Sequence, residues 1–192
     1  TYTDTGLTLK ATTVWEVANA TELEAALNGF QSDDTIKLTA DFTYYKGIVI
    51  DGKNVTFDTG SFTLNVYNEY SSADPASGVG LEVKNGGNVY LIGSGQLYIR
   101  QIEGNTAYGV KVTDASTAMV TNVQVTVYED DAGVGAYADG TGSSIHVLGN
   151  VHVMGVGGCG AKTMGRGSIT VEGTITATIY INIGSTYKGI SS

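Results

Sequence analysis

Several side chains that could bind a ligand or catalyse a reaction recur once in each unit of a repeating sequence pattern. Those that would share an outer strand face, or stand on the two other strands of a repeat, are Glu82, Lys111, Tyr137, Lys162, Tyr90 and Tyr98. Tyrosine rings can stack on sugars and keep a hydrogen-bonding tip, and lysine or glutamate can bind or act on the same ligand. The alternative is a solvated sheet face on which Glu82 and Lys111 pair, contributing less than ~1 kcal/mol.

Catalysis and metal binding have few other candidates. If the chain were an enzyme, its bases would be Lys111, Lys162 or Arg100. Apart from the run of Glu129 to Asp131 near the Arg100 loop, no carboxylate cluster is expected beside an arginine, so no catalytic set is predicted. The acidic run Glu129, Asp130 and Asp131 could hold calcium together with backbone carbonyls, or could simply be hydrated. Calcium is the one cofactor that the sequence suggests.

The repeats themselves indicate a solenoid. Glycines at positions 80, 109, 135, 160 and 189 begin similar segments, at spacings of 29, 26, 25 and 29 residues. Each segment contains three short runs in which apolar residues alternate with polar ones, the pattern of a half-buried strand. Further glycines at 60, 93, 149 and 173 fall between the second and third runs, where we expect corners with positive φ.

The alternation also assigns columns. In the third run, Leu97 is expected to stack on Val123 and Val151. The outward neighbours Tyr98, Gln124, His152 and Thr176 would then form one outer column. His146 and His152 stand on different runs, so a shared metal site is not predicted. Insertions at 68–77, 100–107 and 128–133 are expected to be loops at one corner.

Residues 1–46 differ from the rest and predict an N-terminal cap. A strand near 13–17 is followed by a helix over about 20–28, with Thr21 and Glu24 as a capping box and Gly29 as its C-terminal cap. Residues 33–38, with the sequence DDTIKL, read as a turn and a strand. A helix at this place would cover the apolar end of a solenoid.

This order of helix, Asp-Asp-Thr-Ile turn and strand resembles the cap of right-handed parallel β-helix proteins of the pectate-lyase-like superfamily. It is also similar to β-helical repeats of bacterial cell-surface proteins. The resemblance implies coils over 47–192 and, for the lyases, a Lys or Arg base beside calcium-binding carboxylates. The sequence departs from that pattern at the catalytic positions, because Arg100 and Arg166 are its only arginines.

Composition narrows the partners. The net charge of −9 with no basic stripe argues against nucleic acid, and no apolar run is long enough to insert into a membrane. The single Cys159 rules out an internal disulfide. Residues 187–192 resemble the start of another coil, so we expect a truncated solenoid whose last edge could self-associate end to end.

We therefore expect an all-β, right-handed parallel β-helix with a helix-containing cap. The expected function is non-catalytic, as a stalk, adhesin or glycan-binding module that is secreted or held at a cell surface. Its partner would be a polysaccharide or another surface protein. The alternative is a carbohydrate-active enzyme, either a polysaccharide lyase or a glycoside hydrolase acting on an extended chain.

Overall fold

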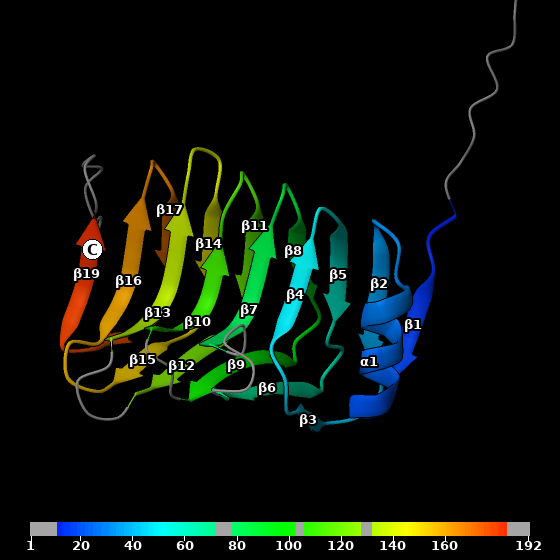
Figure 1. The fold of residues 1–192 in the computed structure, drawn as a ribbon. Coiled ribbons are helices and arrows are strands. Elements are labelled where there is room, and N and C mark those ends of the chain that lie inside the picture. The colour runs from blue at the N-terminus through cyan, green and yellow to red at the C-terminus, as the bar shows by residue number, and fades with distance from the viewer. Residues whose placement is uncertain (1–10, 72–77, 103–105, 128–131, 184–192) are drawn as a thin grey trace, which may run out of the picture.

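The computed structural model describes residues 11–71, 78–102, 106–127 and 132–183 (Figure 1). Strands make up more than half of the described residues, and they lie in three parallel sheets. Sheet A has the order β1-β2-β5-β8-β11-β14-β17, sheet B the order β18-β15-β12-β9-β6-β3, and sheet C the order β19-β16-β13-β10-β7-β4. Nowhere in the described residues is a helix long and apolar enough to cross a membrane.

Each turn of the chain places one strand in sheet C, then one in sheet A, then one in sheet B. The cap consists of β1 (Val14–Val17), α1 (Ala20–Gly29), β2 (Asp34–Leu38) and β3 (Phe42–Tyr44). Coil 1 has β4 (Ile48–Asp51), β5 (Asn54–Asp58) and β6 (Thr63–Glu69). Coil 2 has β7 (Val79–Lys84), β8 (Asn88–Ile92) and β9 (Gln96–Ile102).

The later coils follow the same plan. Coil 3 has β10 (Thr106–Val112), β11 (Thr117–Val120) and β12 (Asn122–Thr126). Coil 4 has β13 (Ala132–Asp139), β14 (Ser144–Val147) and β15 (Val151–Met154). Coil 5 has β16 (Cys159–Met164), β17 (Ser168–Val171) and β18 (Ile175–Thr176), and β19 (Ile179–Ile183) adds one more strand to sheet C.

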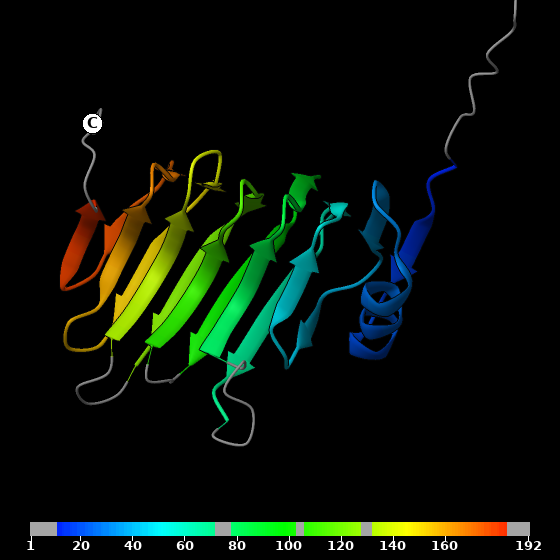
Figure 2. The same cartoon turned by 45° about the horizontal axis from the view of Figure 1, so that its top comes forward.

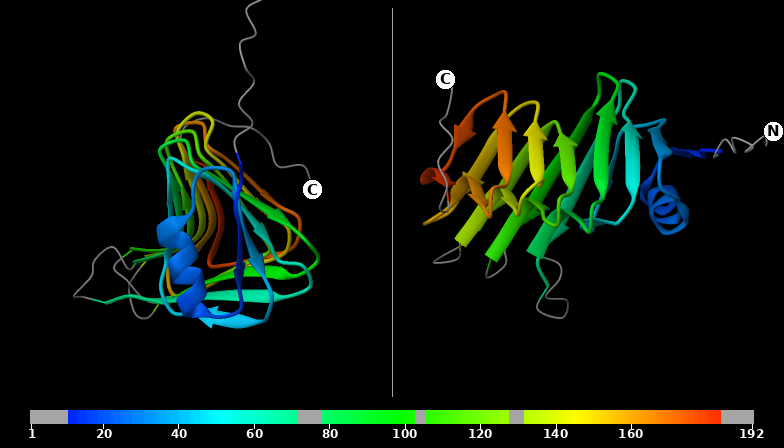
Figure 3. Two further views of the ribbon diagram at one scale, coloured as in Figure 1. Left: turned by 90° about the vertical axis from the view of Figure 1, so that its right-hand side faces the viewer. Right: turned by 90° about the horizontal axis from the view of Figure 1, so that it is seen from above.

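The coils wind in a right-handed sense, and the cross-section is triangular (Figures 1 and 3). In Figure 2 the strands of sheet C run side by side along the whole shaft. The core is the column of side chains enclosed by the three sheets, including Ile50, Phe57, Leu81, Ile99 and Val147, each at most 1% exposed. The expected right-handed parallel β-helix is therefore confirmed.

The repeating glycines occupy one column of sheet C for a steric reason. A Cβ on Gly135 would lie 2.5 Å from the carbonyl oxygen of Gly160 and 2.3 Å from Val151 Cγ1. Gly80 and Gly109 show the same close approach to the next glycine in the column and to an apolar side chain of sheet B. These glycines let the interior branched side chains of sheet B pack directly against the backbone of sheet C.

The last repeat is shorter than the sequence predicts. Cys159 is the register partner of Ile179, and Ala161 is the partner of Ile181. The backbone of Tyr180 therefore stands level with Gly160, only 20 residues further along the chain. The alignment of Gly160 with Gly189 was wrong, because the coils tighten toward β19. Gly189 itself and the predicted start of a coil at 187–192 lie outside the described residues.

The corner glycines have two different roles. Gly60 and Gly93 have φ values of +55° and +94°, as predicted for a sharp bend. Gly149 and Gly173 do not have positive φ, so the prediction was wrong for them. A Cβ on Gly149 would lie 2.5 Å from Asn122 Oδ1, and one on Gly173 would lie 2.5 Å from the carbonyl oxygen of Gly149. At these corners glycine is needed because adjacent coils approach closely.

The cap helix is confirmed, but its ends differ from the prediction. Asn19 is the N-cap and accepts a hydrogen bond from the backbone N–H of Glu22, while the Glu22 carboxylate accepts one from the backbone N–H of Ala18. The box therefore lies two residues earlier than Thr21 and Glu24, and Glu24 pairs instead with Lys46 at 2.6 Å. The chain leaves the helix at Phe30, not through a left-handed glycine.

The helix lies across the end of the shaft (Figure 3) and buries Leu23 and Ala26 completely. Gly29 is required there because a Cβ would lie 2.7 Å from the indole of Trp15. Asp34 ties the cap together: its buried carboxylate accepts hydrogen bonds from Thr13 N at 2.8 Å, Trp15 Nε1 at 3.0 Å and Gln31 N at 2.9 Å. The cap is therefore held by buried apolar side chains of the helix and by the hydrogen bonds to the Asp34 carboxylate.

Two of the predicted loops begin later than expected. β6 continues to Glu69 and β9 to Ile102, so Asn68 and Gln101 belong to strands and face the interior. Asn68 Nδ2 donates to Gln101 Oε1 at 2.8 Å and to the carbonyl oxygen of Val79 at 3.0 Å. A satisfied polar pair therefore replaces the apolar pair that the alternation would place here. The second and third predicted loops also end earlier than expected, because Thr106 and Ala107 belong to β10 and Ala132 and Gly133 to β13. Residues 72–77, 103–105 and 128–131 lie outside the described residues.

Candidate functional site

The six predicted ligand-binding residues are divided among three faces. Glu82, Lys111, Tyr137 and Lys162 are successive register partners on sheet C, so this predicted column is confirmed. Tyr90 lies on β8 in sheet A, and Tyr98 lies on β9 in sheet B. The sheets face different directions (Figure 3), so the structure does not bring the six side chains together.

The sheet C column begins with a carboxylate between two lysines. Glu82 Oε1 lies 2.9 Å from Lys111 Nζ, and Glu82 Oε2 lies 3.4 Å from Lys84 Nζ. Burial acts to raise the pKa of Glu82, but hydrogen bonds to Lys111 and Lys84 and their positive charges together outweigh it, so the pKa lies below its ordinary value. This carboxylate is therefore held as the anion.

The column continues with aromatic and cationic contacts. The rings of Tyr108 and Tyr137 are 5.2 Å apart, and the ammonium groups of Lys111 and Lys162 lie 5.8 Å and 5.9 Å from those two ring centres. Tyr137 donates a hydrogen bond to Asp139 Oδ2 at 3.2 Å. Burial, followed by the charge and hydrogen bond of Asp139, raises the pKa of Tyr137 to about 12. The side chains of this face largely satisfy one another.

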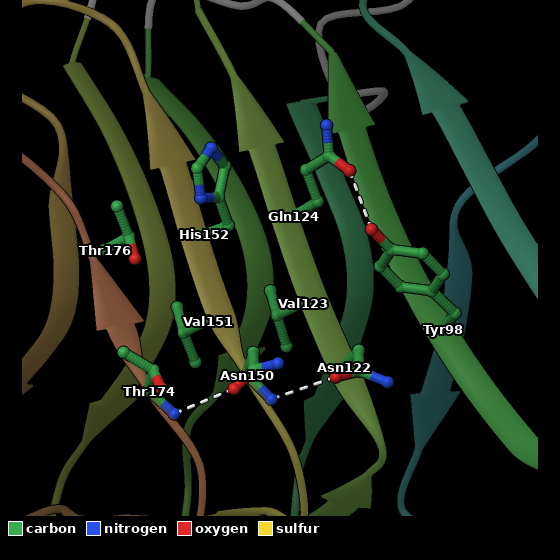
Figure 4. A pocket seen from close by; sticks show the side chains of 9 residues that line it. All are labelled: Tyr98, Asn122, Val123, Gln124, Asn150, Val151, His152, Thr174 and Thr176. Atoms are coloured by element: carbon green, nitrogen blue, oxygen red, sulfur yellow. Dashed lines mark hydrogen bonds between the residues drawn. The ribbon is translucent and has the colours of Figure 1, made fainter.

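Sheet B carries the cavity. An open groove of about 540 Å³ runs along its outer face, across coils 2 to 5 (Figure 4). Its lining residues are Tyr98, Asn122, Val123, Gln124, Asn150, Val151, His152, Thr174 and Thr176. The sequence prediction included only Tyr98 as a ligand-binding residue, so the groove was missed as a site.

The register of sheet B explains part of that miss. Tyr98 is the partner of Asn122, and Gln124 is the partner of Arg100, so the predicted alignment of Tyr98 with Gln124 was wrong by two residues. A shift of two residues keeps every side chain on its own face, so the alternation of apolar residues cannot reveal it. The remaining part of the predicted column, Gln124, His152 and Thr176, is confirmed.

One end of the groove has an aromatic wall. Although Tyr98 is displaced along the strand, its hydroxyl donates to Gln124 Oε1 at 2.7 Å (Figure 4). This hydrogen bond crosses from coil 2 to coil 3 and fixes the phenol ring beside the column. The ring therefore presents a positioned surface at that end of the groove.

The floor of the groove is braced by an amide ladder (Figure 4). Asn122 Oδ1 accepts a hydrogen bond from the backbone N–H of Asn150 at 2.9 Å, and Asn150 Oδ1 accepts one from the backbone N–H of Thr174 at 2.8 Å. Each asparagine thus joins its coil to the next at the start of the sheet B strand. The recurrence of Asn two residues before Gln124 and His152 was the available sequence signal for this ladder.

The groove lining is nearly free of formal charge. It contains no carboxylate and no lysine, and His152 and Tyr98 are its titratable side chains. Amide, hydroxyl and imidazole groups dominate, and such groups both donate and accept hydrogen bonds. This surface can form hydrogen bonds with a polar, uncharged ligand.

The enzyme candidates lie apart from this groove lining. Lys111 and Lys162 are on sheet C, and Lys162 forms no ion pair with any residue that the structure describes. Arg100 is outside the lining but adjoins it, with its guanidinium 5.3 Å from the ring centre of Tyr67 and 5.8 Å from that of Tyr98. No carboxylate pair of the kind used in glycoside hydrolysis lines the groove.

The calcium candidate cannot be placed, because Glu129, Asp130 and Asp131 lie outside the described residues. Within the described residues, no three side chains of His, Cys, Asp or Glu are grouped so that they could hold a metal ion. His146 and His152 are on different sheets, and His146 Nε2 lies 2.8 Å from Glu172 Oε1.

Comparisons with protein-family models, with curated proteins and with solved structures find no match to this chain.

Proposed function

We propose that this chain is a non-catalytic, glycan-binding β-helix of a secreted or cell-surface protein, and that the groove on sheet B is its binding surface. The observation that carries the proposal is the groove lining. It combines a fixed tyrosine ring with amide, hydroxyl and imidazole groups, in an open channel that crosses four coils. The partner is a polysaccharide, or a glycan attached to another surface protein.

The chemistry of the lining favours a sugar over a compact apolar ligand. Sites for small molecules are usually enclosed and mainly apolar, with a few polar groups. Here polar side chains predominate and the channel is open, which suits an extended ligand rich in hydroxyl groups. The tyrosine face offers the apolar surface on which a pyranose ring can stack.

The regular register supports a linear ligand. Gln124, His152 and Thr176 stand at the same level of three successive coils. Adjacent parallel strands are about 4.8 Å apart, a length comparable to one sugar unit in a chain. A glycan lying along the shaft would therefore meet an equivalent position on each coil.

A carbohydrate-active enzyme is the second candidate, and one contact favours it. The ion pair between Lys111 and Glu82 on sheet C joins a potential base to an anionic carboxylate, next to Tyr137. The groove lies on sheet B, however, and this lysine is already paired with Glu82. An increase in absorbance from unsaturated uronates would support the lyase. If the Lys111→Ala variant forms no such product, Lys111 is the base.

We also propose that the chain is related to the pectate-lyase-like superfamily. The parallel β-helix and its N-terminal helix support it at the level of architecture, and the placement at a cell surface rests on the same resemblance.

The binding proposal is tested on a glycan array, with and without calcium, using the wild-type chain and two matched variants. His152→Ala removes a lining side chain, whereas His146→Ala removes the only other histidine, on sheet A. We expect His152→Ala to weaken binding roughly tenfold, the effect of one lost hydrogen bond that leaves its partner unpaired. His146→Ala should bind like the wild type.

Two results would contradict the proposal. One is the absence of binding to every glycan under both conditions. The other is equal binding by wild type and His152→Ala, which would move the binding surface away from sheet B.

A further inference from the structure

Arg100 extends the groove column by one coil. Its Cα is the register partner of Gln124 on β12 and of Tyr67 on β6. Because Gln124 continues into His152 and Thr176, Arg100 occupies the end of this column on the side nearest the cap. A ligand lying along the column would reach the guanidinium at that end.

Among the residues that the structure describes, the contacts of the guanidinium are with two aromatic rings. Its central carbon lies 5.3 Å from the ring centre of Tyr67 and 5.8 Å from that of Tyr98. Arg100 Nε is buried without a hydrogen-bond partner, and Arg100 makes no ion pair within the described part of the chain. Aspartate and glutamate outnumber lysine and arginine in this protein, 19 to 10, which makes an unpaired arginine notable.

An arginine held in this way suits an anionic group. Aromatic stacking fixes the plane of a guanidinium while its N–H edge stays available, and that edge matches the oxygens of a carboxylate or a sulfate. The preference must be for a single acidic group. No lysine or arginine is among the lining residues, so Arg100 at the end of the groove is the one cation beside it in the described residues, and a net charge of −9 opposes the approach of a polyanion.

We propose that the groove takes a mainly neutral linear glycan that carries one acidic group at the Arg100 end. This inference rests on the proposed function, because it specifies the ligand of the same groove. From Arg100 to Thr176 the column spans three steps between coils, or about 14 Å, so the neutral sugars lie over the polar lining while the acid lies against the arginine.

The test compares the affinities of three probes by calorimetry: a neutral tetrasaccharide, the same tetrasaccharide with one terminal carboxylate, and a polyuronate. A fourth probe with one terminal sulfate distinguishes the two acidic groups. The proteins are the wild type, Arg100→Gln, Arg100→Lys and Arg166→Gln. Arg166 is an exposed corner residue, so its replacement removes the same charge elsewhere.

We expect wild type to bind the carboxylated or sulfated probe roughly tenfold more tightly than the neutral one, as for a charge-assisted hydrogen bond. Arg100→Gln should lose this preference and keep neutral binding, Arg100→Lys should keep part of it, and Arg166→Gln should behave as wild type. If Arg100→Gln does not fold, the preference of Arg100→Lys for the acidic probe over the neutral probe tests the inference instead.

Equal affinity for neutral and acidic probes, strongest binding to the polyuronate, or an unchanged preference in Arg100→Gln or Arg100→Lys would each overturn this inference and leave the proposed function standing. Failure to bind any probe would overturn both.

Discussion

At the residue scale, the charges of sheet C are arranged as mutual partners. Glu82 contacts Lys111 and Lys84, while Tyr137 contacts Asp139, Tyr108 and Lys162. The contacts of Glu82 lower its pKa, whereas burial and the contact with Asp139 raise the pKa of Tyr137 to about 12. Each group is therefore held in the charge state that it has at neutral pH.

Replacing Glu82 tests the ion pair. Because the pKa of Glu82 is lowered in the folded state, its contribution to stability is full above its ordinary pKa of 4.5 and is lost as the pH falls through the folded value. Glu82→Gln should reduce the free energy of unfolding by about 1 kcal/mol at pH 7. Measured by urea unfolding, the difference from wild type should be smaller at an acidic pH below 4.5 than at pH 7.

The control is Glu16→Gln, which breaks the exposed pair with Lys37 and should leave stability unchanged at both pH values. A difference between Glu82→Gln and wild type that persists undiminished in acid would rule out the ion pair as its source.

The glycine column makes a second prediction at this scale. Gly135→Ala places a Cβ 2.3 Å from Val151 Cγ1, so it should lower the free energy of unfolding by about 2–3 kcal/mol through overpacking. Gly86→Ala meets no neighbouring atom but keeps a φ of +76°, and should cost about 1 kcal/mol. Thermal unfolding of both variants measures the two costs, and an equal or reversed order would contradict the steric explanation.

At the element scale, one side chain, Asp34, connects several segments of the cap. Asp34 receives hydrogen bonds from the strand before the helix, from Trp15 and from the turn after the helix. Removing its carboxylate leaves three partly buried donors without this acceptor.

Asp34→Ala should therefore destabilise the cap by about 2–4 kcal/mol, and Asp34→Asn by less, because one amide oxygen remains. Trp15 is the only tryptophan of the chain, so its fluorescence reports on the cap directly. Glu16→Ala, which removes an exposed carboxylate from the strand that carries Trp15, is the control. Equal fluorescence transitions in Asp34→Ala and Glu16→Ala would show that the carboxylate of Asp34 does not anchor the cap.

The strands could be predicted because alternation of apolar residues is a property of each segment alone. The register between neighbouring strands could not be predicted in this way. Alternation placed Leu81 and Val83 inward because the period of two belongs to each strand alone. Alternation could not choose between register partners two residues apart, so it misplaced Tyr98 relative to Gln124. The outer column of Gln124, His152 and Thr176 was anticipated, but the groove also depends on that register and on the ladder through Asn122 and Asn150, which alternation does not reveal.

At the scale of the whole molecule, the two ends of the described shaft differ. At the cap end, Leu23 and Ile36 are completely buried. In coil 5 the corresponding interior side chains, Ile169, Val171 and Ile175, are only partly buried, and β18 has two residues. Stability in a solenoid is the sum of contributions from each repeat and its neighbours, so it should decline toward coil 5.

Two natural probes can measure this gradient. Trp15 lies in the cap, and the single cysteine, Cys159, is buried at the start of coil 5. We expect thiol labelling of Cys159 to begin at a lower urea concentration than the change in Trp15 fluorescence, because the last coils open first. Coincident transitions would instead show a single cooperative unit.

The hydrogen bonds between coils are aligned with the shaft, because every sheet runs from one end to the other (Figure 1). A load pulling the two ends apart would therefore act along these bonds and would strip one coil at a time from the weaker end. Each released coil would lengthen the chain while leaving the next coil intact. The molecule would thus yield in steps, as a tether that extends under tension before it breaks.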